Sequence, residues 1–112
     1  MNTHILGTKG EVKAKDYLIS LGYKILETNY SNIIGEIDII AQDQKTIVFV
    51  EVKTRETLKF GYPREAVTLH KQNKIHKVAM AYLKFKRKLN SPFRFDCIEI
   101  LGDEITHLKN CF

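Results

Sequence analysis

Hydrophobic and polar positions recur with two different periods along the chain, and these periods predict its elements. Residues 8–21 follow a helical pattern that Gly22 can end, because glycine readily adopts the left-handed conformation found just past many helices. A second helical pattern has five apolar residues at helical spacing, namely Ile75, Val78, Ala79, Tyr82 and Leu83. Segments 23–30, 36–41, 46–53 and 93–101 are typical of strands, and the tail can add a short fifth strand.

The order of these elements predicts the fold class. The polar AQDQKT segment joins the second and third strands and indicates a hairpin, whereas residues 54–65 are polar, contain Gly and Pro, and indicate a loop. The order α-β-β-β-α-β is typical of an α/β protein in which helices flank a mixed central sheet. At 112 residues, the chain is expected to form one domain, residues 1–112.

The third predicted strand, TIVFVEVK, is apolar on both faces until its end, which is typical of a central strand covered on both sides. Residues two apart on a strand share a face, so Glu51 and Lys53 continue the inward row of Ile47 and Phe49. Buried charges need partners or metal ions. The alternative, an ion pair between strands at a solvated edge, is disfavoured by the apolar flanks.

The preceding strand, GEIDIIA, carries Glu36 and Asp38 on one face. If the hairpin turn centres on residues 44–45, then Asp38 lies opposite Glu51 and Glu36 lies opposite Lys53. Two carboxylates about 4 Å apart repel by on the order of 4 kcal/mol at an effective dielectric constant of 20. Either one of them binds a proton or a cation lies between them.

Ligands that are all oxygen favour Mg²⁺ or Mn²⁺ over zinc. Such an ion can polarise a phosphodiester and lower the pKa of a bound water molecule. Lys53, next to that water, could orient it or stabilise the charge that develops on phosphorus. Phosphodiester hydrolysis is thus one reaction that such a site can support.

Asp38 followed by Glu51-x-Lys53 on the next strand resembles the PD-(D/E)XK, or restriction endonuclease-like, superfamily of nucleases. The segments GEIDIIA, VFVEVKTR, GYPREAV and FRFD resemble more narrowly the uncharacterised YraN-like family, which is similar to archaeal Holliday junction resolvases. This resemblance covers residues 10–99. Glu36-Ile37-Asp38 stands where the superfamily has Pro-Asp, which leaves the supporting role of Glu36 open.

The resemblance implies roles for particular residues. Asp38 and Glu51 would bind the metal ion together with the Val52 carbonyl, and Lys53 would be catalytic. Resolvases add an acid from the first helix, which matches Glu11 here. In the helical pattern, Glu11 lies on the stripe expected to face the sheet, with Gly7, Ala14, Leu18 and Leu21. Lys13 is about 200° away around the axis and is expected to be a solvated surface charge.

Basic residues indicate a polyanionic partner. The formal net charge is +5, and nucleic acid, DNA in preference to RNA, is the partner expected. The candidate contacts with its backbone and bases are Arg55, Lys59, Tyr62, Arg64, Lys71 and Lys74. An ordinary solvated loop explains the first four equally well, since phosphate contacts have no distinctive sequence pattern. Lys84, Lys86, Arg87 and Lys88 are better explained by the dipole at the end of the second helix.

The cysteines, the apolar runs and the histidines indicate the compartment and the kind of metal site to expect. Cys97 and Cys111 lack metal-binding spacing, so both are expected to be reduced, in a cytoplasmic protein without zinc. No apolar run is long enough to cross a membrane. The four histidines form no recognisable constellation, and Asp96 is expected to make a structural hydrogen bond or ion pair.

These observations predict a Mg²⁺- or Mn²⁺-dependent DNA endonuclease that selects branched or junction DNA. The resemblance to resolvases and the small size together imply a homodimer, because two symmetric cuts require two sites. Two alternatives stay open. One is a nucleic-acid-binding module of the same fold that does not cleave, and the other is a small basic adaptor that binds a protein.

Overall fold

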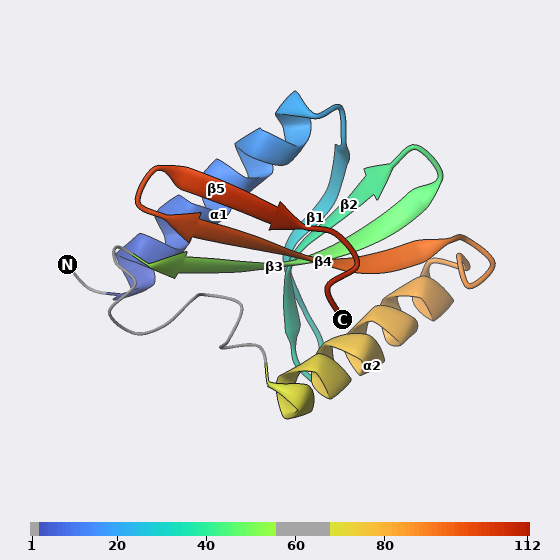
Figure 1. The fold of residues 1–112 in the computed structure, drawn as a ribbon. Helices are drawn as coiled ribbons and strands as arrows, with labels where there is room; N and C mark the ends of the chain where they lie inside the picture. The colour runs from blue at the N-terminus through green and yellow to red at the C-terminus, as the bar shows by residue number, and fades with distance from the viewer. Residues whose placement is uncertain (1–2, 56–67) are drawn as a thin grey trace.

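The computed structural model describes residues 3–55 and 68–112, in which one five-stranded sheet separates two helices (Figure 1). The elements are α1 (Thr3–Ser20), β1 (Lys24–Ser31), β2 (Glu36–Asp43), β3 (Thr46–Arg55), α2 (Leu69–Phe85), β4 (Phe93–Leu101) and β5 (Glu104–Leu108). The strands lie side by side in chain order, and all neighbours are antiparallel except β3 and β4, which are parallel. The predicted α/β class with a mixed sheet is confirmed.

Strand β3 is apolar on both faces because a helix covers each face. On one side, Phe49 packs in a cluster with the buried residues of α2, which are Ile75, Val78, Ala79, Tyr82 and Leu83. On the other side, Val48 and Val50 pack with Ala14 and Leu18 of α1. The predicted central, covered position of β3 is therefore confirmed.

Helix α1 ends as its sequence indicates but begins earlier. Gly22 has φ of +90°, its N–H donates to the Ile19 carbonyl, and the Tyr23 N–H donates to the Leu18 carbonyl, which is the glycine-terminated helix end. The helix begins at Thr3 rather than at residue 8.

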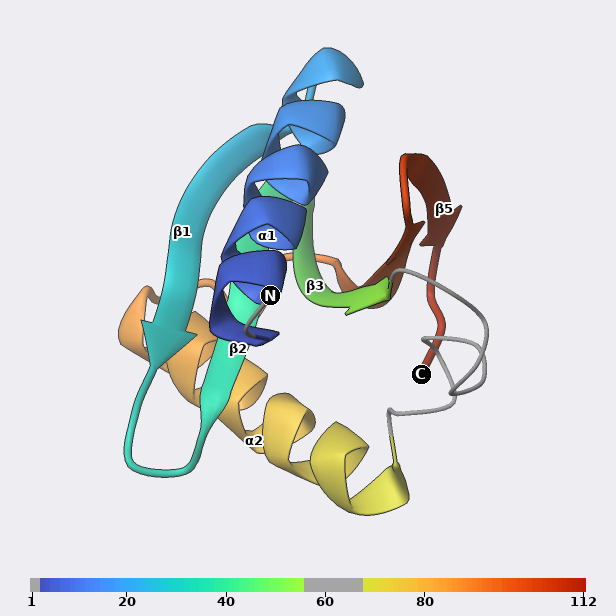
Figure 2. The ribbon, with the colours of Figure 1, turned by 90° about the vertical axis from the view of Figure 1, so that its left-hand side faces the viewer.

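The hairpin register follows the prediction, but the pairing stops early. Asp43 pairs with Thr46 around the two-residue turn 44–45, and the ladder ends at the Ile39–Val50 pair. Beyond that point β2 stays paired with β1 as far as Glu36, while β3 stays paired with β4 as far as Arg55. The sheet therefore forks, and Figure 2 shows the end of β3 turning away from the start of β2.

The expected ladder pairs of Asp38 with Glu51 and of Glu36 with Lys53 do not form. At this point β2 keeps its regular pairing with β1, with Ile37 opposite Tyr30 and Ile39 opposite Thr28, and leaves β3. Ile37 packs in the α2 cluster and Ile39 packs in the α1 cluster. Asp38 and Glu51 still meet, but through their side chains.

The two cysteines are paired, so the expectation that both are reduced is wrong. Strand β5 returns antiparallel to β4, and the Cys111 N–H donates to the Phe95 carbonyl at 2.8 Å, which places Cys111 beside Cys97 in a disulfide. Linear spacing could not show this, because the turn after β5 brings the two residues together. Among the described residues, neither helix is long and apolar enough to span a membrane.

Candidate active site

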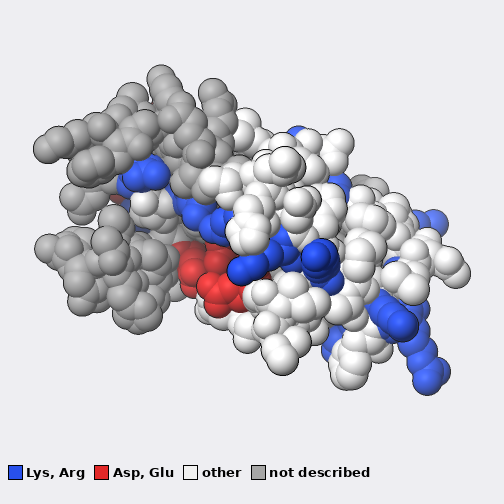
Figure 3. Space-filling view, turned by 90° about the horizontal axis from the view of Figure 1, so that it is seen from below, with Lys and Arg blue, Asp and Glu red and all other residues white. Residues whose placement is uncertain are grey.

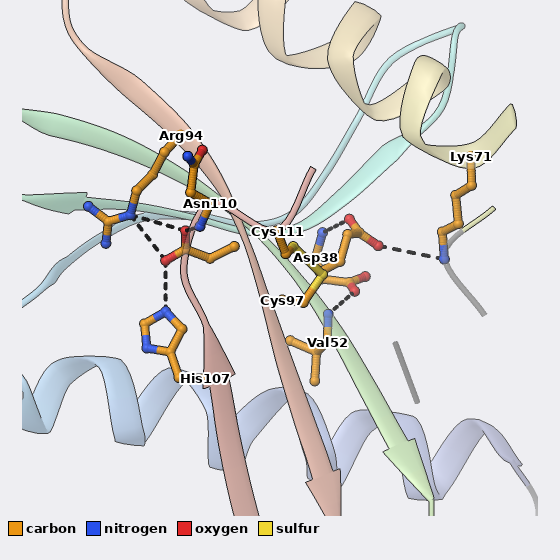
Figure 4. The surroundings of a disulfide bond; sticks show 10 residues. Asp38, Val52, Lys71, Arg94, Cys97, His107, Asn110 and Cys111 are labelled. Atoms are coloured by element: carbon orange, nitrogen blue, oxygen red, sulfur yellow. Dashed lines mark hydrogen bonds and ion pairs between the residues drawn. A yellow bond between two sulfur atoms is a disulfide. The ribbon is translucent and has the colours of Figure 1, made fainter. Parts of the chain in front are cut away.

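The candidate active site lies at the fork between β2 and β3, where side chains replace the missing ladder bonds. The Val52 N–H donates to Asp38 Oδ2 at 2.8 Å, and the Asp38 N–H donates to Glu51 Oε1 at 3.4 Å (Figure 4). Each carboxylate is thus anchored to the backbone of the opposite strand. The predicted meeting of Asp38 and Glu51 is confirmed in this form.

Glu51 is an acid in an unfavourable place. Its residue is 3% exposed, and burial, followed by the charge of Asp38, raises the pKa of Glu51 to about 8. Lys71, the Asp38 N–H and Lys53 act in the opposite direction without outweighing these effects. The Glu51 carboxyl group therefore holds a proton more readily than an ordinary glutamate, and a cation beside it favours its charged form.

Two lysines lie beside this carboxylate. Lys71 of α2 forms an ion pair with Glu51, with Nζ 3.6 Å from Oε2. Burial and the neighbouring Lys71 ammonium lower the pKa of Lys53. Burial also opposes the charge of Lys71, but contact with Lys53 and the carboxylates of Glu51 and Asp38 raise its pKa. Of the two lysines, Lys53 therefore releases its proton first.

Helix α1 reaches the fork from the opposite face of the sheet. Glu11 and Asp38 line one pocket of about 130 Å³, together with Val12, Lys15, Thr28, Asn29 and Ile39. A Cβ on Gly10 would overlap the side chain of Thr54 on β3, so glycine allows the helix to approach this closely. The prediction that Glu11 faces the sheet is confirmed by this pocket and by burial of the stripe residues Ala14 and Leu18.

Of two further expectations about α1, the one for Leu21 is wrong and the one for Lys13 is confirmed. Leu21 is 49% exposed because it follows the last helical residue, Ser20, and so leaves the stripe. Lys13 is exposed as predicted, and its Nζ lies 3.4 Å from Asp103 Oδ1 in a surface ion pair. Glu11 and Lys13 thus lie in different environments.

The acids of the fork fit a hard divalent cation. The donors available from Asp38, Glu51 and Glu11 are all carboxylate oxygens, and the buried Glu51 carboxylate gains from an added positive charge. Within residues 3–55 and 68–112, no group of three or more His, Cys, Asp or Glu side chains is already placed to hold a metal ion. Mg²⁺ commonly uses only one or two protein carboxylates and keeps several waters, so this arrangement is compatible with it. Ligation by the Val52 carbonyl stays a prediction.

The remaining predicted site residues are dispersed. Glu36 is exposed at the start of β2, paired with Ser31, and makes no described contact with Glu51. Arg55 ends β3, and its buried Nε has no partner among the described residues. Lys59, Tyr62 and Arg64 lie outside the described residues. Lys74 is exposed on α2, a helix whose sequence has four lysines and no acid.

Charged side chains of both signs lie together on one face of the molecule. In Figure 3, acidic side chains form a single patch, and lysine and arginine side chains border it and continue away over the same face. This is the side on which α2 lies in Figure 1. At the fork itself, the described contact of this kind is the ion pair of Lys71 with Glu51.

Strand β4 contributes a buried network that the sequence pattern indicated only in part. Asp96 is fully buried and accepts hydrogen bonds from Arg94 Nε at 3.0 Å and the Asn110 N–H at 2.9 Å, and it lies 2.7 Å from His107 Nε2. Burial acts to raise the pKa of Asp96, but the bonds with His107, Asn110 and Arg94 lower it below its usual range. The structural role predicted for Asp96 is confirmed.

The part that His107 plays in this network was missed. Its Nδ1 lies 3.1 Å from the Tyr17 hydroxyl on α1, so His107 links β5 to that helix. The spacing of Arg94 and Asp96, two apart on one strand face, was the only signal in the sequence. A second missed acid, Glu99 of β4, is 7% exposed and is the register partner of Lys53.

The family model and the similar proteins that match this chain all point to the same family. The model of the uncharacterised protein family UPF0102 matches residues 10–100. A UPF0102 protein of Fusobacterium nucleatum is 49% identical, over 98% of this chain and 92% of its own length. UPF0102 proteins of Clostridioides difficile and Caldicellulosiruptor saccharolyticus are 49% and 44% identical, and each match covers both chains completely.

Proposed function

The chain belongs to the uncharacterised protein family UPF0102, and we propose that it is a divalent-metal-dependent nuclease of the restriction endonuclease-like type. The observation that carries the proposal is the fork, where Asp38 and Glu51 are each anchored to the opposite strand. A buried acid with a raised pKa beside a second acid is typical of functional sites, and the nearby Lys53 and Lys71 suit a phosphodiester substrate.

Each residue has a role in this proposal. A bound Mg²⁺ or Mn²⁺ would polarise the scissile phosphate and acidify water. Asp38 and Glu51 hold the ion, with Glu11 facing the same pocket as Asp38. Lys53, whose pKa is lowered, orients the attacking water and can accept its proton as the P–O bond to the leaving group breaks.

The substrate would lie along α2. This helix presents Lys71, Lys74, Lys77 and Lys84 without an acid. From the first to the last of these lysines the helix rises roughly 20 Å, at about 1.5 Å per residue, which is enough to follow several phosphates. Preference for DNA, selection of branched or junction substrates and a homodimer rest on the resemblance to junction resolvases.

A nuclease panel tests the proposal. Purified protein is incubated with four-way junction, flap, duplex and single-stranded DNA and with RNA, in Mg²⁺, Mn²⁺ or EDTA. Cleavage of branched DNA that EDTA abolishes is expected. Lys53→Ala should lower the rate by roughly 10²-fold or more, whereas Lys45→Ala, in the exposed hairpin turn, should leave it unchanged.

Each other result has a distinct meaning. Undiminished cleavage by Lys53→Ala would overturn the catalytic assignment of this lysine. Salt-dependent binding of nucleic acid without any cleavage would favour the non-catalytic binding module. Absence of nucleic-acid binding would leave the protein-binding adaptor.

A further inference from the structure

Lys71 occupies the place at Glu51 that a metal ion would need. Glu51 Oε1 accepts from the Asp38 N–H, and Oε2 faces Lys71 Nζ at 3.6 Å, so both oxygens of this carboxylate are engaged. The Glu51 side chain is 4% exposed, whereas that of Lys71 is 38% exposed. The ammonium therefore covers the carboxylate from the solvent side.

The stability of α2 by itself does not explain why a lysine stands at position 71. Thr68 caps α2 and accepts from the Lys71 N–H at 3.2 Å, which fixes Lys71 in the first turn. The first turn is the positive end of the helix dipole, where a cation is unfavourable, and α2 has no acid there to compensate. The ion pair with Glu51 offsets this unfavourable position.

We infer that Lys71 is a built-in counter-cation for Glu51 that a divalent metal ion displaces, and that the displaced ammonium then binds a phosphate of the substrate. This inference rests on the proposed function. Two cations beside one buried carboxylate repel each other, so the ion and the ammonium compete for Oε2. Lys71 already reaches solvent and borders Lys53, so a small side-chain movement is enough to redirect it.

Competition has a reciprocal consequence. If the metal ion releases Lys71 for the substrate, then a bound polyanion that holds Lys71 must strengthen metal binding by the same factor. Metal and nucleic acid would therefore each favour the binding of the other. Neither alone would give the complete site.

Calorimetric titration with MgCl₂ in the absence of substrate tests the competition. Lys71→Met keeps the apolar length of the side chain and removes its charge. It should bind Mg²⁺ more tightly than the wild type, by on the order of 5- to 150-fold, which is the usual range of coupling between sites. Lys74→Met is the matched control, because Lys74 is exposed on the same helix and makes no described contact with Glu51, and it should leave the affinity unchanged.

The outcomes separate the two claims. Equal or weaker Mg²⁺ binding by Lys71→Met would overturn the inference and leave the proposed function standing. Absence of Mg²⁺ and Mn²⁺ binding in the wild type and both variants would overturn the proposed function and the inference together. Should Lys71→Met fail to fold by circular dichroism, Lys71→Gln provides the same comparison with a polar side chain.

Fluorescence anisotropy with a labelled four-way junction tests the second half. In the Lys53→Ala background, which blocks cleavage, Mg²⁺ should raise the affinity for the junction. The double variant Lys53→Ala/Lys71→Met should show a smaller gain from Mg²⁺. If Mg²⁺ raised the affinity for the junction equally in both variants, Lys71 would not bind the substrate after its displacement.

Discussion

At the scale of single residues, the protonation of Glu51 links the fold to pH. Its pKa is about 8 in the folded protein, raised from a reference of 4.5 by burial and by Asp38. Between these values the unfolded chain loses the proton first, so the free energy of unfolding should fall as pH rises, by up to about 1.4 kcal/mol per pH unit. The stabilisation is complete below pH 4.5 and is lost as pH passes through 8.

Urea denaturation of metal-free protein between pH 5 and pH 8 measures this slope. Glu51→Gln should flatten it and should be more stable than the wild type at pH 8, because the amide does not ionise. Glu104→Gln, an exposed acid at the start of β5, should keep the wild-type slope. Parallel curves for the wild type and Glu51→Gln would show that Glu51 titrates normally.

Glu11 and Lys13 test whether neighbouring charges on α1 serve different purposes. Glu11 shares a pocket with Asp38, while Lys13 makes an exposed ion pair with Asp103. Glu11→Ala should lower metal-dependent cleavage severalfold without unfolding the protein, and Lys13→Ala should change it little, since exposed ion pairs contribute little. Paired cleavage and melting assays decide this, and equal effects at the two positions would contradict the assignment.

The main site residues could be predicted from the sequence because they are charged residues within the otherwise apolar segments that form the buried strands β2 and β3. Asp38, Glu51 and Lys53 stand out for this reason. The contact of Lys71 with Glu51 could not be predicted, because it depends on how α2 is oriented on the sheet. The pattern of apolar residues along the chain does not determine that orientation. The same holds for His107, which reaches Asp96 only through the pairing of β5 with β4.

At the scale of elements, the approach of α1 to β3 depends on Gly10. Gly10→Ala would place a methyl group against Thr54, and the helix and strand must then separate. A loss of about 1–3 kcal/mol in the free energy of unfolding is expected, as for other overpacked sites, together with reduced cleavage because Glu11 moves with the helix. Gly35→Ala is the control, since its Cβ would lie 3.6 Å from Val78, an ordinary contact. Equal stability of the two variants would show that α1 has room at this point.

The elements themselves followed closely from their patterns, and the exceptions have local causes. The bounds of β4 and the buried face of α2 agree with the prediction because each buries a regular apolar stripe. The early end of the β2–β3 ladder could not be predicted, because Glu36, Asp38 and Ile40 alternate regularly in sequence, whereas in the structure Ile37 and Ile39 pack in different clusters. Cysteine pairing was hidden because it depends on a turn past the last strand.

At the scale of the whole molecule, Asp96 connects four segments of the chain. It bonds to Arg94, which in turn binds Tyr23 and Asp43, and it bonds to the Asn110 N–H and His107. Asp96→Ala would leave a buried cation and several donors without their acceptor, and a loss of about 3–5 kcal/mol in the free energy of unfolding is expected. Urea denaturation measures it, with Asp103→Ala as an exposed control that should leave the midpoint unchanged. A small effect at Asp96 would mean that water replaces the carboxylate.

The chain-order arrangement of the strands has a consequence for the order of assembly. Strands β1, β2 and β3 are joined by short turns, as are β4 and β5, whereas β3 and β4 are separated in the sequence by α2. Contacts between distant residues form more slowly than local ones, so docking of β4 on β3 is expected to be the late step of folding. The early three-stranded unit already holds Asp38 and Glu51, but Lys71 arrives only with α2. A newly synthesised molecule would therefore carry both acids before it acquires their counter-cation.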